Sequence, residues 1–201
     1  MEEEGRGEQL DSSKKNSKKP TLKAIRNSYA DMGVEAFYKS AGSVYSNPHF
    51  PYISTLLRNN ESRIDYSNIL DFCCGSGEVS RVLKDLSYEH SEGSDPFTQK
   101  AYVATMNKAC LGYTFQDVIQ GKMDGRQYSS IICSFAMHLC PEKKLYPLIQ
   151  QLFNCTKQLV LLTPHKRPKL DEVDGVALEF EDFTLTERGK KVRLRSYRKI
   201  G

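Results

Sequence analysis

The stretch "DFCCGSGEVS", residues 71–80, contains residue types suited to binding a nucleotide. Gly75 and Gly77 leave the backbone bare, so a ligand can approach it without meeting a Cβ atom. The apolar residues before Asp71 predict a strand, and the residues after Gly77 predict a helix whose free N–H groups point at the turn. A strand, a glycine turn and a helix in this order predict a nucleotide-binding site.

The spacing of further residues narrows the kind of nucleotide. A dinucleotide fingerprint has a third glycine or alanine three residues after the second glycine, and Ser80 stands there instead. The phosphate-binding pattern that ends in Gly-Lys-Ser/Thr does not follow either. An acidic residue roughly 20 positions downstream is expected to hold ribose hydroxyls, and Asp95 in "GSDP" has this place. Asp117, in "FQDVI", is a third polar candidate.

Histidines and basic residues follow two further expected strands. His138 lies in "SFAMHLC" and His165 in "LLTPHKRP". An imidazole titrates near neutral pH, so either residue is a candidate base, and His138 is equally a candidate support for a cofactor pocket. Lys166 and Arg167 come next, and they suit either a carboxylate or phosphate of a substrate or a solvated turn.

The six cysteines predict no metal site. None of them forms a C-x-x-C pair, and no group of cysteines and histidines has zinc spacing. Cys73 and Cys74 lie inside the glycine turn, where we expect one to pack inward and the other to lie beside the ligand. A reactive thiol requires a lowered pKa, which nothing in the sequence indicates.

Alternating elements must position these residues. The pattern predicts strands at 68–74, 89–96, 112–119, 128–137 and 158–164. It predicts helices between them at 78–86, 97–111 and 143–155, and a closing hairpin at 175–200. This alternation predicts a Rossmann-like, doubly wound α/β sheet that is mostly parallel and carries an antiparallel C-terminal hairpin strand.

The N-terminal part differs in composition. Residues 1–20 are polar and predict a disordered, solubilising tail. A nucleic-acid contact or an import signal is the alternative role of its lysines. Residues 21–60 have a helical period and many aromatic residues, so they predict a helical cap on a core of residues 68–201, within one domain of residues 21–201. Tyr38, Tyr45 and His49 of this cap are candidate substrate contacts; core packing is the alternative for the tyrosines.

Composition limits the cell compartment and the partners. The chain of 201 residues has a net charge of +4, and no apolar run approaches the roughly 20 residues that span a bilayer. The N-terminus lacks the apolar core of a signal peptide. We therefore expect a cytoplasmic protein without a membrane partner, with the nucleus as the alternative. The mild charge permits an RNA partner without requiring one.

The landmarks together resemble the class I S-adenosylmethionine-dependent methyltransferases, from about residue 29 to the C-terminus. The segment "ICSFAMHL" is similar to a stretch of the ubiquinone-biosynthesis-like group of these enzymes. The resemblance implies that the turn with Asp71, Gly75 and Gly77 holds the methionine part of the cofactor, that Asp95 holds the ribose and that Asp117 approaches the adenine. The expected cofactor contacts also include Cys73, Ser76, Pro96, Val118 and Ser134.

The resemblance implies methyl transfer from a sulfonium by in-line displacement. Alignment of the groups and exclusion of water supply most of the rate gain, and a base matters only where the acceptor atom carries a proton. We expect a small-molecule acceptor. The alternatives are an RNA or protein acceptor, contacted by the lysine-rich tail and "HKRPK", and a module that binds the cofactor without catalysis.

Overall fold

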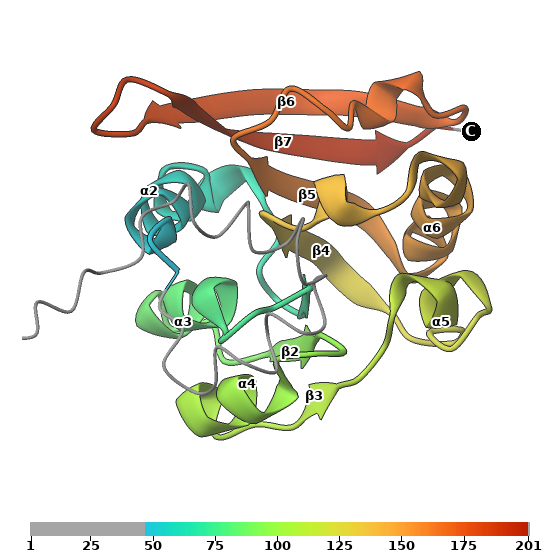
Figure 1. Ribbon diagram of the computed structural model, residues 1–201, viewed down its shortest axis with the longest axis horizontal. Coiled ribbons are helices and arrows are strands. Elements are labelled where there is room, and N and C mark those ends of the chain that lie inside the picture. Colours follow the sequence, from blue (N-terminus) through green and yellow to red (C-terminus); the bar gives the residue numbers. More distant parts are fainter. Residues whose placement is uncertain (1–46, 201) are drawn as a thin grey trace, which may run out of the picture. The chain divides into compact units, whose positions relative to one another are not determined.

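The computed structural model describes residues 47–200 (Figure 1). The expectations for the tail of residues 1–20, for most of the cap of residues 21–60, and for Tyr38 and Tyr45 lie outside the described residues. Of the three cap residues predicted to contact a substrate, His49 lies within the described residues.

One seven-stranded sheet, in the order β3-β2-β1-β4-β5-β7-β6, runs through the described residues. The first five strands in chain order are mutually parallel, whereas β7 is antiparallel to β5 and to β6. The strands are β1 (Ile69–Phe72), β2 (Ser91–Ser94), β3 (Cys110–Leu111), β4 (Tyr128–Ser134), β5 (Thr156–Thr163), β6 (Val176–Leu185) and β7 (Lys191–Lys199). The order reverses at β1, between β2 and β4. The predicted doubly wound sheet with an antiparallel C-terminal hairpin is therefore confirmed.

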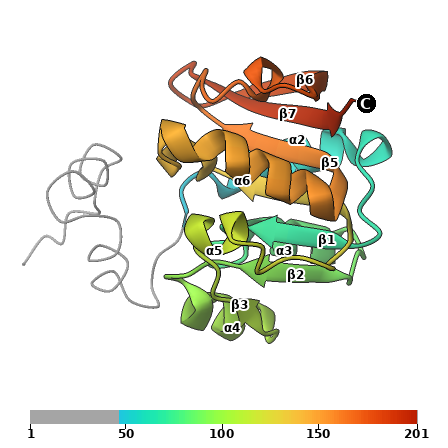
Figure 2. The same cartoon turned by 90° about the vertical axis from the view of Figure 1, so that its right-hand side faces the viewer.

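Helices cover both faces of this sheet. The α-helices are α2 (Phe50–Asn59), α3 (Glu78–Asp85), α4 (Gln99–Met106), α5 (Phe115–Ile119) and α6 (Glu142–Cys155), and the short 3-10 turns are η2 (Glu61–Arg63), η3 (Met137–Leu139) and η4 (Leu170–Glu172). Figure 2 shows α5 and α6 in front of the strands and α2 and α3 behind them. None of the helices in the described range is long and apolar enough to cross a membrane.

Alternation along the central strands divides the core into two clusters. In β5, Leu159 and Leu161 pack in the cluster under α5 and α6, whereas Val160 and Leu162 pack in the cluster under α2 and α3. Successive side chains of a strand point to opposite faces, so an unbroken apolar strand supplies both clusters. Burying each such side chain stabilises the fold by roughly 1.5–3 kcal/mol.

The prediction was wrong around the third strand. The structure has β3 at Cys110–Leu111, inside the predicted helix of residues 97–111, and a helix at Phe115–Ile119, inside the predicted strand of residues 112–119. Asn107 ends α4 in the left-handed conformation, with φ 53°. Thr114 and Asp117 form a capping box that starts α5. These local side-chain bonds outweigh the strand-like alternation of "GYTFQDVI".

Candidate cofactor and substrate site

The glycine turn leaves β1 in an unusual backbone conformation. Cys73, Gly75 and Gly77 have φ angles of 59°, 58° and 94°, and left-handed geometry is strained for a residue with a Cβ atom. At Gly77 a Cβ atom would also stand 2.8 Å from Cγ of Met106. Glycine is therefore required at position 77 both by the backbone and by the packing of α4 against the turn.

Asp71 lies fully buried at the end of β1, directly under this turn. The backbone N–H and the hydroxyl of Ser80 donate to its Oδ2 at 3.1 and 2.8 Å, so Ser80 ties α3 to β1. Burial raises the pKa of the Asp71 carboxyl well above its usual value. Its Oδ1 is buried without a hydrogen-bond partner among residues 47–200, and a ligand donor can supply that partner.

Asp95 lies directly after β2 and faces the glycine turn. Its Oδ1 accepts hydrogen bonds from the N–H groups of Phe97 and Thr98 at 2.8 and 3.0 Å, and its Oδ2 accepts one from Gly75 at 3.4 Å. A carboxylate offers about four lone-pair directions, so one remains for a ligand. The structure thus brings Asp95 and the turn together, while the ribose contact stays a prediction.

Further buried polar atoms near this turn have no partner in the described range. They are Oγ of Ser94, at the end of β2, and Oγ1 of Thr98, before α4. The turn and β2 are joined here, because Cys73 and Cys74 donate their N–H groups to the Ser94 carbonyl at 2.7 and 3.2 Å. Unsatisfied buried polar groups cost free energy, so these atoms favour a ligand that carries donors and acceptors.

Glu78, which was not among the residues predicted from the sequence, shapes the turn. Its Oε1 accepts the hydroxyl of Ser76 at 2.7 Å, and its Oε2 accepts the Ser76 N–H at 3.2 Å. An acidic residue at the first position of a helix is favoured by the helix dipole, and this signal was available in the sequence. Ser76 is therefore held by its own turn, and its predicted contact with a cofactor is untested.

The thiols near the turn are buried or in contact with one another. Sγ of Cys74 lies 3.6 Å from Sγ of Cys110, and both cysteines are free. Burial raises the pKa of the Cys74 thiol, and the pKa of the Cys73 thiol is raised chiefly by a hydrogen bond with Cys133. Both thiols of the turn are therefore protonated at neutral pH, in agreement with a packing role.

Asp117 is occupied by partners of its own segment. Its Oδ2 accepts from the N–H and the hydroxyl of Thr114 at 2.9 and 2.8 Å, and its Oδ1 pairs with Nζ of Lys122 at 2.6 Å. The bond to Lys122 is the main reason that its pKa falls to about 2. The side chain of Val118 is fully buried in the cluster under α5 and α6. An adenine contact at either residue remains a prediction.

The two candidate bases are neighbours. His138 lies in η3, after β4, and His165 follows β5, the parallel neighbour of β4. Their ring centroids are 4.4 Å apart, with a tilt of 46°. The N–H of His165 donates to Oγ1 of Thr163 at 3.0 Å, which fixes the start of its loop. Parallel strands that end side by side thus bring together two imidazoles that are 27 positions apart in the sequence. The sequence placed each histidine after a strand, and their roles stay a prediction.

His49 lies against the other side of the end of β4. It precedes α2, and its ring stacks on Phe135 at 4.4 Å between centroids and 13° between planes. Phe135 packs in the cluster under α2 and α3, whereas Met137, two residues on, packs under α6. Burial lowers the pKa of His49, so its ring is neutral at neutral pH. Its Nδ1 is buried without a partner in the described part.

The remaining predicted residues surround the same strand ends. Ser134 is buried at the end of β4, and Pro96 is half-buried after β2. Lys166 and Arg167 are exposed in the loop after β5. The carbonyl of Lys166 accepts a hydrogen bond at 2.8 Å from Nη1 of Arg195 on β7. This loop is therefore fastened to the antiparallel edge of the sheet.

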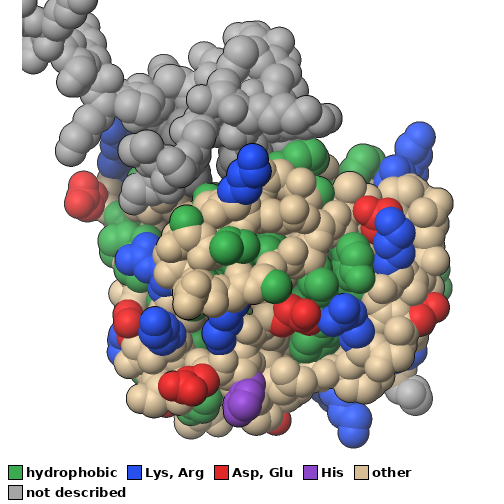
Figure 3. All heavy atoms as spheres, turned by 90° about the horizontal axis from the view of Figure 1, so that it is seen from below, with side chains coloured by type: hydrophobic (Ala, Val, Ile, Leu, Met, Phe, Trp, Pro, Cys, Tyr) green, Lys and Arg blue, Asp and Glu red, His purple; other side chains and the backbone are tan. Residues whose placement is uncertain are grey.

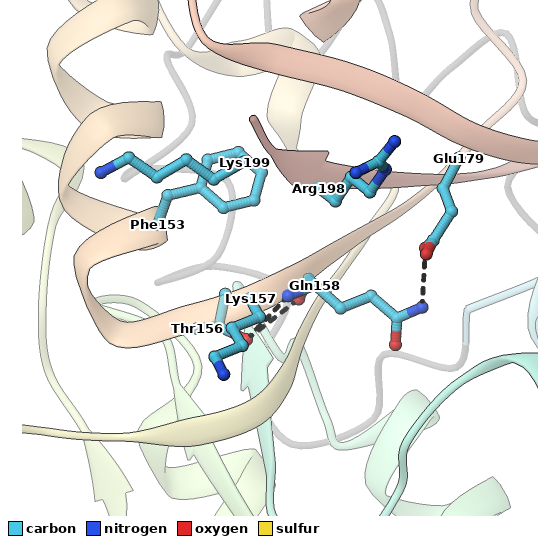
Figure 4. Close-up of a pocket in the computed structure, with 7 residues that line it drawn as sticks. All are labelled: Phe153, Thr156, Lys157, Gln158, Glu179, Arg198 and Lys199. Carbon is cyan, nitrogen blue, oxygen red and sulfur yellow. Dashed lines mark hydrogen bonds between the residues drawn. The ribbon is translucent and has the colours of Figure 1, made fainter. Parts of the chain in front are cut away.

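A hollow at the opposite end of β5 is drawn in Figure 4. Its lining residues are Phe153, Thr156, Lys157, Gln158, Glu179, Arg198 and Lys199. The amide of Gln158 donates to Oε2 of Glu179 at 3.1 Å, the contact that is dashed across the hollow. Ligands of doubly wound sheets bind at the carboxyl ends of the strands, and this hollow begins at the amino end of β5.

Comparison with known proteins identifies a relative that matches most of the chain. The chain is 31% identical to the uncharacterized protein C17A5.05c of Schizosaccharomyces pombe, and the match covers 73% of this chain and 77% of that one. The chain belongs to the same family as that protein. No family model matches the chain.

Solved structures share the fold at low sequence identity. Magnesium protoporphyrin IX methyltransferase ChlM from Synechocystis PCC 6803, with bound SAM, matches with a TM-score of 0.56 and 16% identity over 91% of this chain and 99% of that one. A TehB-like SAM-dependent methyltransferase from Corynebacterium glutamicum matches at 0.57 and 16% over 88% and 99%. A putative RNA methyltransferase, PH1948 from Pyrococcus horikoshii, matches at 0.56 and 14% over 78% and 88%. The chain therefore has the class I S-adenosylmethionine-dependent methyltransferase fold.

Proposed function

We propose that the chain is an S-adenosylmethionine-dependent methyltransferase that transfers a methyl group by in-line displacement to a small-molecule acceptor. The observation that carries this proposal is the convergence of the glycine turn with two acids. The backbone N–H of Gly75 donates to Oδ2 of Asp95 at 3.4 Å. Asp71 is buried beneath the same turn, and its Oδ1 has no hydrogen-bond partner in the described range. The fold is also that of a methyltransferase with bound SAM.

The cofactor has complementary groups for this site. Its amino group can donate to Asp71, its ribose hydroxyls can donate to Asp95, and its methionine part can approach the bare backbone of Gly75 and Gly77. The sulfonium supplies an activated methyl group. The protein then has to align the acceptor and exclude water.

His138 and His165 are proposed to act on the acceptor. Their ring centroids are 4.4 Å apart, at the ends of the adjacent strands β4 and β5, and β4 is the neighbour of β1, which carries Asp71. A neutral imidazole can accept a proton from an oxygen or nitrogen acceptor as its bond to the methyl group forms. Two neighbouring rings also allow one to orient the acceptor while the other accepts the proton.

The charges on one face of the molecule give no support to an RNA acceptor. On the face that Figure 3 shows, basic and acidic side chains are interspersed, and neither sign forms a continuous field. An RNA-binding face of a protein typically carries a basic patch or stripe, because phosphate contacts supply much of the affinity.

Calorimetry with S-adenosylmethionine tests the cofactor site. We expect one molecule to bind per chain and Asp95→Ala to weaken binding about 10-fold or more, because hydrogen bonds to charged groups contribute roughly 1.5–3 kcal/mol. Asp95→Asn, which keeps an acceptor for Phe97 and Thr98, separates the ligand contact from the folding of the loop. Asp85→Ala, on an exposed side chain at the end of α3, is the matched control. Unchanged affinity in Asp95→Ala excludes the ribose contact, and absence of binding to the wild type overturns the proposal.

Transfer of a labelled methyl group to extracts tests the acceptor class. Extracts separated into metabolites, RNA and protein are incubated with the chain and methyl-labelled cofactor. We expect label in the metabolite fraction. Label in RNA or protein overturns the small-molecule acceptor, and cofactor binding without transfer to any fraction overturns the enzymatic role.

A further inference from the structure

Two arginines of β7 share one carboxylate. Arg193 and Arg195 are two residues apart in the strand, so their side chains point to the same face, toward Glu181 of the neighbouring β6. Nε of Arg195 forms a short ion pair with Oε2 of Glu181, and Nε of Arg193 lies 3.8 Å from Oε1. This group of three residues therefore carries one positive charge in excess.

The excess charge falls on Arg193. Arg195 is 7% exposed and also donates to the Lys166 carbonyl, so it has a close carboxylate and a backbone acceptor. Arg193 is 16% exposed, and its ion pair with Glu181 is at the long end of the range. A guanidinium carries five donors in a planar fork that matches an oxyanion. Holding such a group largely out of water with one distant partner among residues 47–200 is unfavourable, and an added anion relieves that cost.

Arg193 lies at the carboxyl end of β5, beside the proposed substrate site. Its register partner on β5 is Thr163, the last residue of that strand, whose hydroxyl accepts the N–H of His165. The same loop continues with Lys166 and Arg167, both exposed. The loop that carries these two cations therefore starts beside Arg193 and is tied to β7 through Arg195, at the strand ends where ligands of this architecture bind.

We propose that Arg193, with Lys166 and Arg167, binds an oxyanion of the methyl acceptor, and that Arg193 selects for acceptors that carry one. The inference rests on the proposed function and adds the substrate class: a small acid with a carboxylate or a phosphate. The guanidinium binds the oxyanion by paired N–H bonds, and Arg195 fastens the loop of His165 and Lys166 beside it. The anionic end of the acceptor thus fixes the reacting atom near the two imidazoles.

The test separates a metabolite extract on an anion-exchange resin at neutral pH before labelling. We expect the acceptor in the retained fraction, and we expect Arg193→Gln to lower the methylation rate at low acceptor concentration about 10- to 100-fold, as loss of a charged hydrogen bond does. Arg193→Lys should restore part of the rate, because it keeps the charge and loses the fork. Arg198→Gln, on an exposed arginine of the same strand, should leave the rate unchanged. Acceptor activity in the unretained fraction, or an unaffected Arg193→Gln, overturns the inference.

Two further measurements complete the experiment. Treatment of the retained fraction with alkaline phosphatase abolishes its acceptor activity if the oxyanion is a phosphate monoester and spares it if the oxyanion is a carboxylate. Calorimetry with S-adenosylmethionine should give the wild-type affinity for Arg193→Gln, which also shows that the variant is folded. If the wild type does not bind the cofactor, the proposed function is overturned. If it binds the cofactor but shows no preference for anionic acceptors, this inference alone is overturned.

Discussion

At the scale of single residues, hydrogen bonding and burial have opposite effects on the pKa of the Asp71 carboxyl. Its Oδ2 receives both donors of Ser80, which favour the charged carboxylate. Full burial disfavours that charge more strongly, so the pKa is raised. A raised carboxyl pKa means that the folded state binds a proton more tightly than the unfolded state, and stability falls as pH rises above the ordinary value of 3.8.

Asp71→Asn should therefore stabilise the protein at neutral pH and weaken the binding of the cofactor. Asparagine keeps an acceptor for Ser80 and lacks the carboxyl group, which is charged in the unfolded chain at pH 7 and whose charge burial disfavours in the folded state. We expect the free energy of unfolding in urea to rise by about 0.5–2 kcal/mol at pH 7, with a smaller gain at pH 5. The affinity for S-adenosylmethionine should fall about 10-fold, because an amide replaces the proposed acceptor of the amino group.

Ser80→Ala is the comparison for this variant. It removes one of the donors to Asp71 and keeps the carboxyl, so it should lower stability at pH 7. A stability difference between Asp71→Asn and the wild type that does not change with pH would contradict the role given to burial.

At the scale of elements, α5 shows where local chemistry decides. Its five residues are too few to form a stable helix alone, so the capping box of Thr114 and Asp117 and the packing against α6 maintain it. The lowered pKa of Asp117 means that its contribution is present above the ordinary value of 3.8 and is lost as pH falls toward 2. The resemblance to the methyltransferases implied an adenine contact for the same residue.

Asp117→Ala distinguishes these two roles. If capping is the main role, the variant lowers Tm at pH 7, the difference shrinks as pH approaches 2, and the affinity for S-adenosylmethionine stays within about twofold of the wild type. Added salt should reduce the Tm difference, since the pair with Lys122 is solvent-exposed. Lys122→Ala, which leaves the capping box intact, is the matched variant. A large loss of cofactor affinity with unchanged Tm would instead support the adenine contact.

The elements also show what the sequence could predict. Apolar strands such as β4 and β5 and the hairpin around Gly189 were predicted because burial and turn chemistry leave local patterns. The helix at Phe115–Ile119 was missed because five residues do not distinguish the two periods. The sequence placed His138 and His165 after two strands, but it did not predict the contact between their rings, which depends on the side-chain conformations. The shared carboxylate of Glu181 did not, since it depends on the register between β6 and β7.

At the scale of the whole described chain, the strands that form the site also form the core. β1 supplies Leu70 and Phe72 to the cluster under α5 and α6, and Ile69 to the cluster under α2 and α3. β4 and β5 supply both clusters in the same way. The proposed cofactor and acceptor sites lie where these central strands end. A ligand that binds there is therefore linked to the folding of the elements on both faces.

Binding of the cofactor should therefore raise the Tm of the protein as one cooperative transition. At a concentration 100 times Kd, linkage stabilises the folded state by about 2.7 kcal/mol, which corresponds to roughly 5–11 °C for a chain of this size. Differential scanning calorimetry with and without S-adenosylmethionine measures the shift. At the same concentration Arg193→Gln should keep it, since the oxyanion site is separate, whereas Asp95→Ala should lose most of it. A Tm that does not respond to the cofactor, or a shift confined to one of two separate transitions, would contradict the coupling of site and core.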